Sequence, residues 1–174
     1  MTTWVYVDET KRAGYVIAAV TVTDPEPARK IVRGLVLPGQ RRLHMKHEQP
    51  SRRRAIVSAL TTMPVTATVY DAARRYRTER EARSACLAAL IRDLAAGGDT
   101  RLVIEQDDSL LPSDRHELFQ LTRQSGAVDV LRYEHQRAHA ELLLALPDVV
   151  AWCWVRSGDW RRRVSPIITT IRHV

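Results

Sequence analysis

Runs of apolar residues divide the chain into segments with the lengths of strands and helices. Near the start, Trp4 to Asp8 and Gly14 to Val22 are apolar runs separated by the polar turn Glu9 to Arg12. This pattern predicts two strands joined as an antiparallel hairpin. A third apolar run, Val65 to Tyr70, begins directly after Pro64 and predicts a third strand.

Helical spacing occurs between the second and third predicted strands. Asp24 followed by Pro25 is a helix start signal, and apolar residues then recur at helical spacing until Pro38 and Gly39 end the pattern. Ser51 is a candidate cap for a second helix. We therefore expect a helical insert at about residues 25–62.

The second half of the chain alternates helices with strands. The clearest helix runs from about Thr78 to Ala96, where an apolar stripe is stopped by Gly97 and Gly98. After it we predict a strand from Arg101 to Glu105, a helix capped by Ser113 and ending at Gly126, a strand from Ala127 to Tyr133, and a late helix within the apolar segment Leu142 to Val155. No Pro/Gly/Ser-rich stretch divides the 174 residues, so the pattern predicts a single α/β domain over residues 1–174.

The charge balance indicates a polyanionic partner. The chain has 27 Lys and Arg residues against 20 Asp and Glu residues, a net charge of +7, and Lys11, Lys30 and Lys46 are its only lysines. Arginine forks suit phosphate geometry better than ammonium groups do. Nucleic acid, either DNA or RNA, is therefore the expected partner, although an Arg-rich genome produces the same bias without any ligand.

Two arginine triplets are the densest basic clusters and the candidates for binding nucleic acid. They are Arg52, Arg53, Arg54 and Arg161, Arg162, Arg163. Such residues bind the phosphate backbone without reading sequence. The alternative is a solvated helix start or loop.

The chain shows no signal for a membrane. No stretch approaches 18 apolar residues, and Met1 to Trp4 leads into a strand at once, with no basic start or small-residue cleavage site. We therefore expect a cytoplasmic protein with no membrane partner.

Three acidic residues lie where a metal site is expected. Asp8 ends the first predicted strand, Glu105 ends the strand that starts at Arg101, and Asp148 is the single acid of the late apolar segment. Magnesium prefers hard oxygen ligands such as carboxylates. Asp107 and Asp108 compete with Glu105 for the second position, because they follow it directly.

His44 and His47 form a His-x-x-His pair in the basic stretch after the first insert helix. A zinc site is one interpretation, but further ligands at recognisable spacing are lacking. An ordinary polar position is the other interpretation that the residues alone allow.

Three short motifs resemble one family. Tyr6-Val7-Asp8-Glu9-Thr10 looks like the N-terminal Tyr-x-Asp-Glu-Ser-Gly signature of bacterial proteins catalogued as domain of unknown function 3800. Leu43-His44-Met45-Lys46 is similar to the family's His-containing segment, and residues 144–151 resemble its late Gln-Leu-Ala-Asp-Leu-Val-Ala helix. Their order and spacing extend the resemblance along most of the chain.

The chain departs from the family's pattern at three positions. Thr10 replaces Ser, Lys11 replaces Gly, and Pro147 stands where the family has Ala before the late Asp. We expect Pro147 to place Asp148 in the first turn of its helix, where the helix N-terminus favours an ionised carboxylate.

The resemblance implies a ribonuclease-H-like fold with a mixed five-stranded sheet, in which strands 1–3 are antiparallel and strands 4 and 5 are parallel to strand 1. It also implies that His44 lies near the active site, where it contacts a phosphate or moves a proton. Asp8, Glu105 and Asp148 would then bind Mg²⁺ or Mn²⁺, as two ions.

The sequence thus predicts a metal-dependent nuclease that hydrolyses phosphodiester bonds. Two alternatives remain open. One is a non-catalytic member of the same fold that binds nucleic acid or protein. The other is a toxin- or defence-associated protein that acts through a protein partner.

Overall fold

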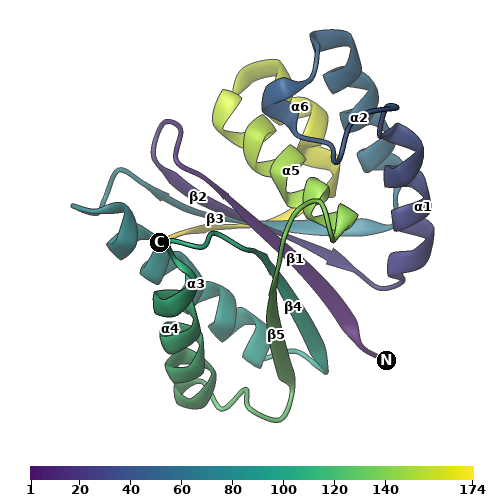
Figure 1. The fold of residues 1–174 in the computed structure, drawn as a ribbon. Coiled ribbons are helices and arrows are strands. Elements are labelled where there is room, and N and C mark those ends of the chain that lie inside the picture. The colour runs from purple at the N-terminus through teal and green to yellow at the C-terminus, as the bar shows by residue number, and fades with distance from the viewer.

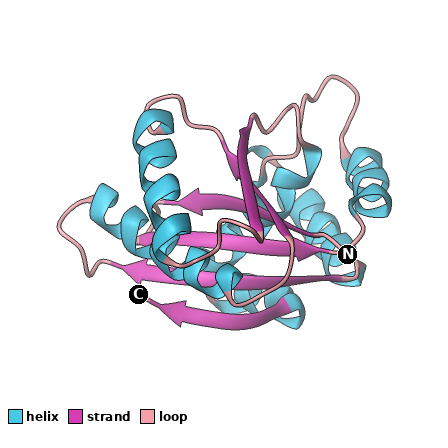
Figure 2. Cartoon of the chain, turned by 90° about the horizontal axis from the view of Figure 1, so that it is seen from below, coloured by secondary structure: helices cyan, strands magenta, loops and turns pink.

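The computed structural model describes residues 1–174 as one six-stranded sheet with helices on both faces (Figures 1 and 2). The strands are β1 (Thr3–Thr10), β2 (Tyr15–Val22), β3 (Val65–Ala73), β4 (Thr100–Glu105), β5 (Leu131–Gln136) and β6 (Ile168–His173). The α-helices are α1 (Pro25–Leu35), α2 (Pro50–Thr62), α3 (Glu79–Ala95), α4 (Leu111–Gln124), α5 (Ala145–Arg156) and α6 (Gly158–Val164). Three short 3₁₀ helices are η1 (Met45–His47), η2 (Leu142–Leu144) and η3 (Ser165–Ile167).

The strand order of the sheet is β5-β4-β1-β2-β3-β6. As predicted, β1, β2 and β3 pair antiparallel, β4 is parallel to β1, and β5 is parallel to β4. The expected count of five strands is wrong, because β6 pairs parallel to β3 at the opposite edge. Most of its side chains are exposed, so Ile168–His173 lacks the apolar run that marks the inner strands.

Two predicted boundaries around α4 are also wrong. β5 begins at Leu131, because Ala127 to Val130 form a turn after Gly126, whose φ is +71°. β5 lies at an edge and alternates polar residues, which weakens its sequence signal. Ser113 does not cap α4, since the helix already begins at Leu111 and the Ser113 hydroxyl donates to the Leu110 carbonyl.

Two apolar clusters fill the space on either side of the sheet. α1, α2, α5 and α6 cover one face, and α3 with α4 covers the other (Figure 1). β1 contributes to both, because Tyr6 packs in the first cluster while Val5 and Val7 pack in the second. This alternation decides toward which layer each polar residue at the strand ends points.

Local signals explain how the elements around the cleft start and turn. Thr78 and Glu81 form a capping box at the start of α3, which places that helix close to where its periodicity predicted it. Gly14 closes the β1–β2 turn at a φ of +121°, and a Cβ there would lie 2.5 Å from the Ala73 carbonyl oxygen. Only glycine fits this turn, which also carries Arg12.

The lengths of the helices and the state of the two cysteines complete the description of the fold. None of the helices is both long and apolar enough to cross a membrane. Cys86 and Cys153 are free and fully buried, and burial raises the pKa of each thiol to about 12. Both cysteines are therefore inert packing residues.

Candidate active site

Asp8 and Glu105 are brought together by the parallel pairing of β1 with β4. Val7 is opposite Ile104, the last pair in that register, so the next residues are neighbours. These are Asp8, which lies within β1, and Glu105, which ends β4. Asp8 shares the face of Tyr6, and Glu105 shares the face of Val103. Both carboxylates therefore point toward the layer that contains α5.

Asp148 lies in that layer, in the first turn of α5, as predicted from Pro147. Its Oδ2 accepts the backbone N–H of Met45 at 2.8 Å, which ties α5 to η1. His44 precedes η1 and faces the same region, and its buried Nδ1 is the one buried side-chain polar atom without a hydrogen-bond partner. The tie between α5 and η1 thus positions both Asp148 and His44.

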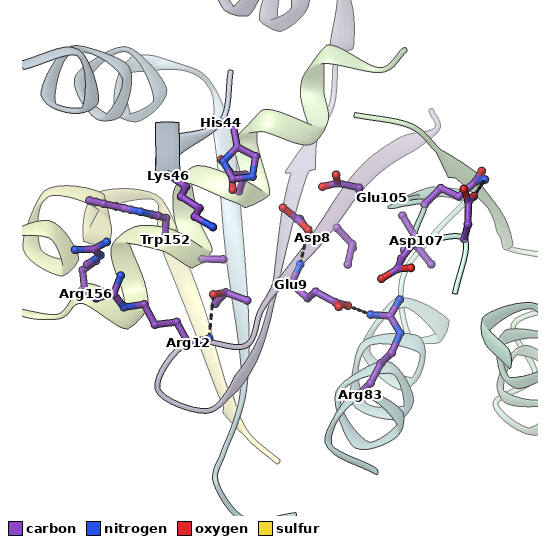
Figure 3. A pocket seen from close by; sticks show the side chains of 17 residues that line it. Asp8, Glu9, Arg12, His44, Lys46, Arg83, Glu105, Asp107, Trp152 and Arg156 are labelled. Atoms are coloured by element: carbon purple, nitrogen blue, oxygen red, sulfur yellow. Dashed lines mark hydrogen bonds and ion pairs between the residues drawn. The ribbon is translucent and has the colours of Figure 1, made fainter. Parts of the chain in front are cut away.

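A cleft of about 760 Å³ contains all four predicted site residues (Figure 3). Asp8 lies at its centre, with Glu105 on one side and His44 on the other. The complete lining comprises Val7, Asp8, Glu9, Thr10, Arg12, His44, Lys46, Arg83, Ile104, Glu105, Gln106, Asp107, Asp108, Asp148, Ala151, Trp152 and Arg156. Residues from distant parts of the chain thus meet in a single polar cleft.

The carboxylates in the cleft destabilise one another. Burial, followed by the negative charges of Glu105 and Asp148, raises the pKa of Asp8 well above its ordinary value. Burial also raises the pKa of Asp148, although His44 and the Met45 N–H partly oppose the shift. Because a positive charge nearby stabilises ionised carboxylates, this group of acids favours a bound cation.

Metal binding is tested by the donor set and its spacing. Carboxylate oxygens are the ligands that Mg²⁺ and Mn²⁺ prefer, and the mutual repulsion of the acids fits such an ion. However, no three or more His, Cys, Asp or Glu side chains are grouped as a ready-made metal site. Glu105 instead pairs with Arg42 at 3.0 Å. The donor chemistry therefore fits a divalent ion, although the Glu105 carboxylate also has Arg42 as a protein partner.

Asp107 and Asp108 lie at the rim of the cleft and are committed to a turn. Asp107 accepts the N–H of Ser109 at 2.9 Å, and Asp108 pairs with Arg137 at 3.0 Å. Hydrogen bonds from Ser109 lower the pKa of Asp107, and those from Gln106 and Arg137 lower the pKa of Asp108. Glu105, by contrast, adds to the effect of burial in raising the pKa of Asp8, through its charge and through a side-chain hydrogen bond.

The first predicted arginine triplet is divided between different contacts at the start of α2. Arg52 pairs with Glu48 and donates to the Leu35 carbonyl, so its guanidinium is used within the protein. Arg53 contacts the ring of Trp152, a residue that lines the cleft, and Arg54 is exposed. Only Arg53 of this triplet is therefore linked to the cleft.

The second predicted triplet lies on α6 and makes intramolecular contacts. Arg161 lies over the ring of Trp154 and donates to the Trp154 carbonyl. Arg162 and Arg163 both pair with Asp159. None of the three lines the cleft.

A buried ionic network behind the cleft has no counterpart in the sequence prediction. Arg83 on α3 forms a two-armed ion pair with Asp114 on α4, at 2.8 and 2.7 Å, and His135 on β5 contacts Asp114 at 3.1 Å. Arg83 also pairs with Glu9, next to Asp8 (Figure 3). The only sequence signal for this network is that Arg83 lies beside the apolar stripe of α3. The partners of Arg83 lie far from it in the chain. Arg42, the partner of Glu105, was missed for the same reason.

Comparisons with known proteins identify the fold. No family model matches the chain, and no curated protein matches it. Among solved structures, it is similar to a chain in the structure of the PCNA:RNase HII complex from Archaeoglobus fulgidus, with a TM-score of 0.58 and 15% sequence identity. The match covers 88% of this chain and 73% of that chain. The fold is therefore ribonuclease-H-like, as predicted, with a sixth strand added.

Proposed function

We propose that this protein is a divalent-metal-dependent nuclease that hydrolyses phosphodiester bonds of DNA or RNA. The observation that supports this function most is that Asp8, Glu105 and Asp148 line one cleft in a ribonuclease-H-like fold. These residues would hold Mg²⁺ or Mn²⁺, as two ions. Such ions, when bound, lower the pKa of an attacking water and stabilise the leaving oxygen of the phosphodiester.

The protein's own residues have distinct roles in this proposal. Asp8 lies at the centre of the cleft, where burial and the charges of Glu105 and Asp148 raise its pKa, and the three carboxylates together would hold the metal ions. His44 lines the cleft beside Asp148, where its ring would contact a phosphate or move a proton, and its buried Nδ1 has no protein partner. The ion pair between Arg83 and Glu9 holds Glu9 in place, and with it the backbone next to Asp8.

One observation favours a second candidate function. Because Glu105 is neutralised by Arg42 and the acids are not grouped as a metal site, the cleft also suits a non-catalytic member of this fold. Such a protein would bind nucleic acid or a protein partner without cleaving anything.

Cleavage assays separate the two candidates. Labelled single- and double-stranded DNA and RNA are incubated with Mg²⁺, Mn²⁺ or EDTA. We expect cleavage only with metal, and a loss of about 10²-fold or more in Asp8→Asn, by analogy with removing one electrostatic contact to a transition state. Glu105→Gln should lose a similar amount.

The matched controls are Asp107→Asn and Asp108→Asn, which remove the same charge from acids committed to the turn. They should cost much less activity than Asp8→Asn. Cleavage that persists in EDTA, or that is equally strong in Asp8→Asn, would rule out the metal mechanism. No cleavage of any substrate by the unmutated protein would favour the binding function.

A further inference from the structure

Acidic and basic side chains lie on different sides of the cleft. Figure 3 shows Glu105 and Asp107 on one side of Asp8, and Arg12, Lys46 and Arg156 on the other. The three cations come from different elements, namely the β1–β2 turn, η1 and the end of α5. Their convergence on one wall is therefore a product of the tertiary structure.

The cations of this wall have no carboxylate partner. Arg12, Lys46 and Arg156 form no ion pair, and neither does Arg53, which lies beside them. By contrast, the arginines around other parts of the cleft are neutralised, as Arg83 is by Glu9 and Asp114. The positive charge of this wall is thus uncompensated within the protein.

The ring of Trp152 contacts two of the arginines in this region. The guanidinium carbons of Arg53 and Arg156 lie 4.7 and 4.5 Å from the centre of its ring, and Trp160 packs edge-on against it at 5.0 Å. Arg53 is held further by donating to the carbonyls of Met45 and Lys46. Because Trp152 is only 9% exposed, it supports guanidinium groups and does not offer a face for stacking a base.

Arg12 and Arg53 lie close enough to Arg156 for their charges to affect it. Partial burial and the positive charges of Arg12 and Arg53 lower the pKa of the Arg156 guanidinium. A fixed group of like charges without a counterion is an anion site. Guanidinium groups suit phosphate geometry, and several cations spread along a wall suit consecutive phosphates of a polymer.

We propose that Arg12, Lys46, Arg53 and Arg156 form the subsite that holds the phosphate backbone of a nucleic acid strand beside the carboxylates. This inference rests on the proposed function, which it deepens by assigning the strand's path. The subsite binds phosphates through cations alone, so it binds without base preference. It also differs from the two arginine triplets that the sequence singled out, since Arg53 is the only residue they share.

Binding without cleavage tests the proposal. Fluorescent single-stranded DNA and RNA oligonucleotides are titrated in EDTA and followed by anisotropy. The variant Arg12→Gln/Arg156→Gln should bind about tenfold or more weakly at about 100 mM salt, and its salt slope should fall by about 1.5, since each phosphate contact contributes about 0.7 on a single strand.

The matched control is Lys30→Gln/Arg33→Gln, which removes the same charge from exposed residues of α1 outside the cleft. It should stay within about twofold of the unmutated protein, as expected for cations that do not contact the phosphates. Equal losses in both double variants, or no loss in either, would overturn the subsite. Competition by a nucleoside monophosphate as effective as that by the oligonucleotide would overturn its assignment to a polymer.

The outcome is independent of catalysis because EDTA is present throughout. A protein that shows the expected binding pattern but never cleaves retains this subsite and loses the nuclease function. A protein that cleaves with unchanged binding in Arg12→Gln/Arg156→Gln retains the nuclease function and loses the subsite.

Discussion

The surroundings of Asp8 disfavour its ionised form. Asp8 is surrounded by Glu105 and Asp148 and partly removed from water, so its ionised form is disfavoured. Residues that lower stability in this way are typical of functional sites, where the cost is offset when the ligand binds. An ionised Asp8 therefore lowers the stability of the folded protein, but it is well placed to bind a cation.

We predict that Asp8→Asn is more stable than the unmutated protein in EDTA at neutral pH. A raised pKa in the folded state gives stability that is present at low pH and lost as the pH rises through that pKa, so the ionised Asp8 is a cost at pH 7. Thermal unfolding should show a Tm higher by about 2–4 °C for each kcal/mol recovered.

The difference in Tm should disappear at acid pH, where Asp8 is protonated in the unmutated protein too. Added Mg²⁺ should raise the Tm of the unmutated protein and leave Asp8→Asn nearly unchanged, because only a ligand that binds the folded state stabilises it. A destabilised Asp8→Asn in EDTA would contradict the electrostatic account of the site.

At the scale of elements, the Arg83 network joins α3, α4 and β5 behind the cleft. Arg83 and Asp114 are 5% and 2% exposed, so their charges are almost completely removed from water. Breaking such a pair leaves an uncompensated buried charge, whereas an exposed pair costs little to lose. The network therefore fixes how the helical layer packs against β1, which carries Glu9 and Asp8.

We predict that Asp114→Asn lowers the free energy of unfolding by about 3 kcal/mol at neutral pH. Burial alone would raise the pKa of Asp114, but hydrogen bonds from His135 and Arg83 outweigh it and hold that pKa below its ordinary value of 3.8. A lowered pKa gives stability that is present above the ordinary value and lost as the pH falls through the folded pKa.

Denaturant unfolding as a function of pH checks this prediction. The difference in the free energy of unfolding between Asp114→Asn and the unmutated protein should be constant near neutral pH. It should become smaller below pH 3.8. Asp159→Asn, which removes an exposed partner of Arg162 and Arg163, is the control and should change stability much less. A gap that widens at acid pH would contradict the assignment.

At the scale of the whole molecule, the cleft lies where β1 and β4 meet the layer that contains α5. The sheet supplies Asp8 and Glu105, and α5 supplies Asp148. The unpaired cations come from the β1–β2 turn, η1, α2 and α5. A polyanion can therefore approach the acids only if the cations screen them. The net charge of +7 adds a general attraction at longer range.

We predict that nucleic acid binding is dominated by charge and indifferent to sequence. With four cations on the wall, the affinity for a single strand should fall with salt at a log–log slope of about −3. Oligonucleotides of unrelated sequence and equal length should bind within about threefold of one another. Affinity that is unchanged between low and high salt would favour the protein-partner alternative.

Local features of the sequence determined most of the elements and their order along the chain, whereas the arrangement of the first five strands in the sheet came from the family resemblance. The hairpin of β1 and β2 and the capped helix α3 follow from periodicity and cap residues within a few positions. The predicted end of the first strand at Asp8 is wrong, because β1 continues in its pairing with β2 to Thr10. Pro147 did predict the place of Asp148 in its helix. These features were predictable because each depends on neighbours in the sequence.

Only the tertiary structure decided which of these residues meet. β6 and the start of β5 were missed because edge strands bury too little apolar surface to leave a periodic signal. The density of arginine triplets did not reveal that Arg52, Arg162 and Arg163 are neutralised by Glu48 and Asp159, while Arg12 and Arg156 remain unpaired. The periodicity of a segment shows on which face of a helix or strand each residue lies. It does not show which residue of a distant segment will be the partner, because that depends on how the layers pack.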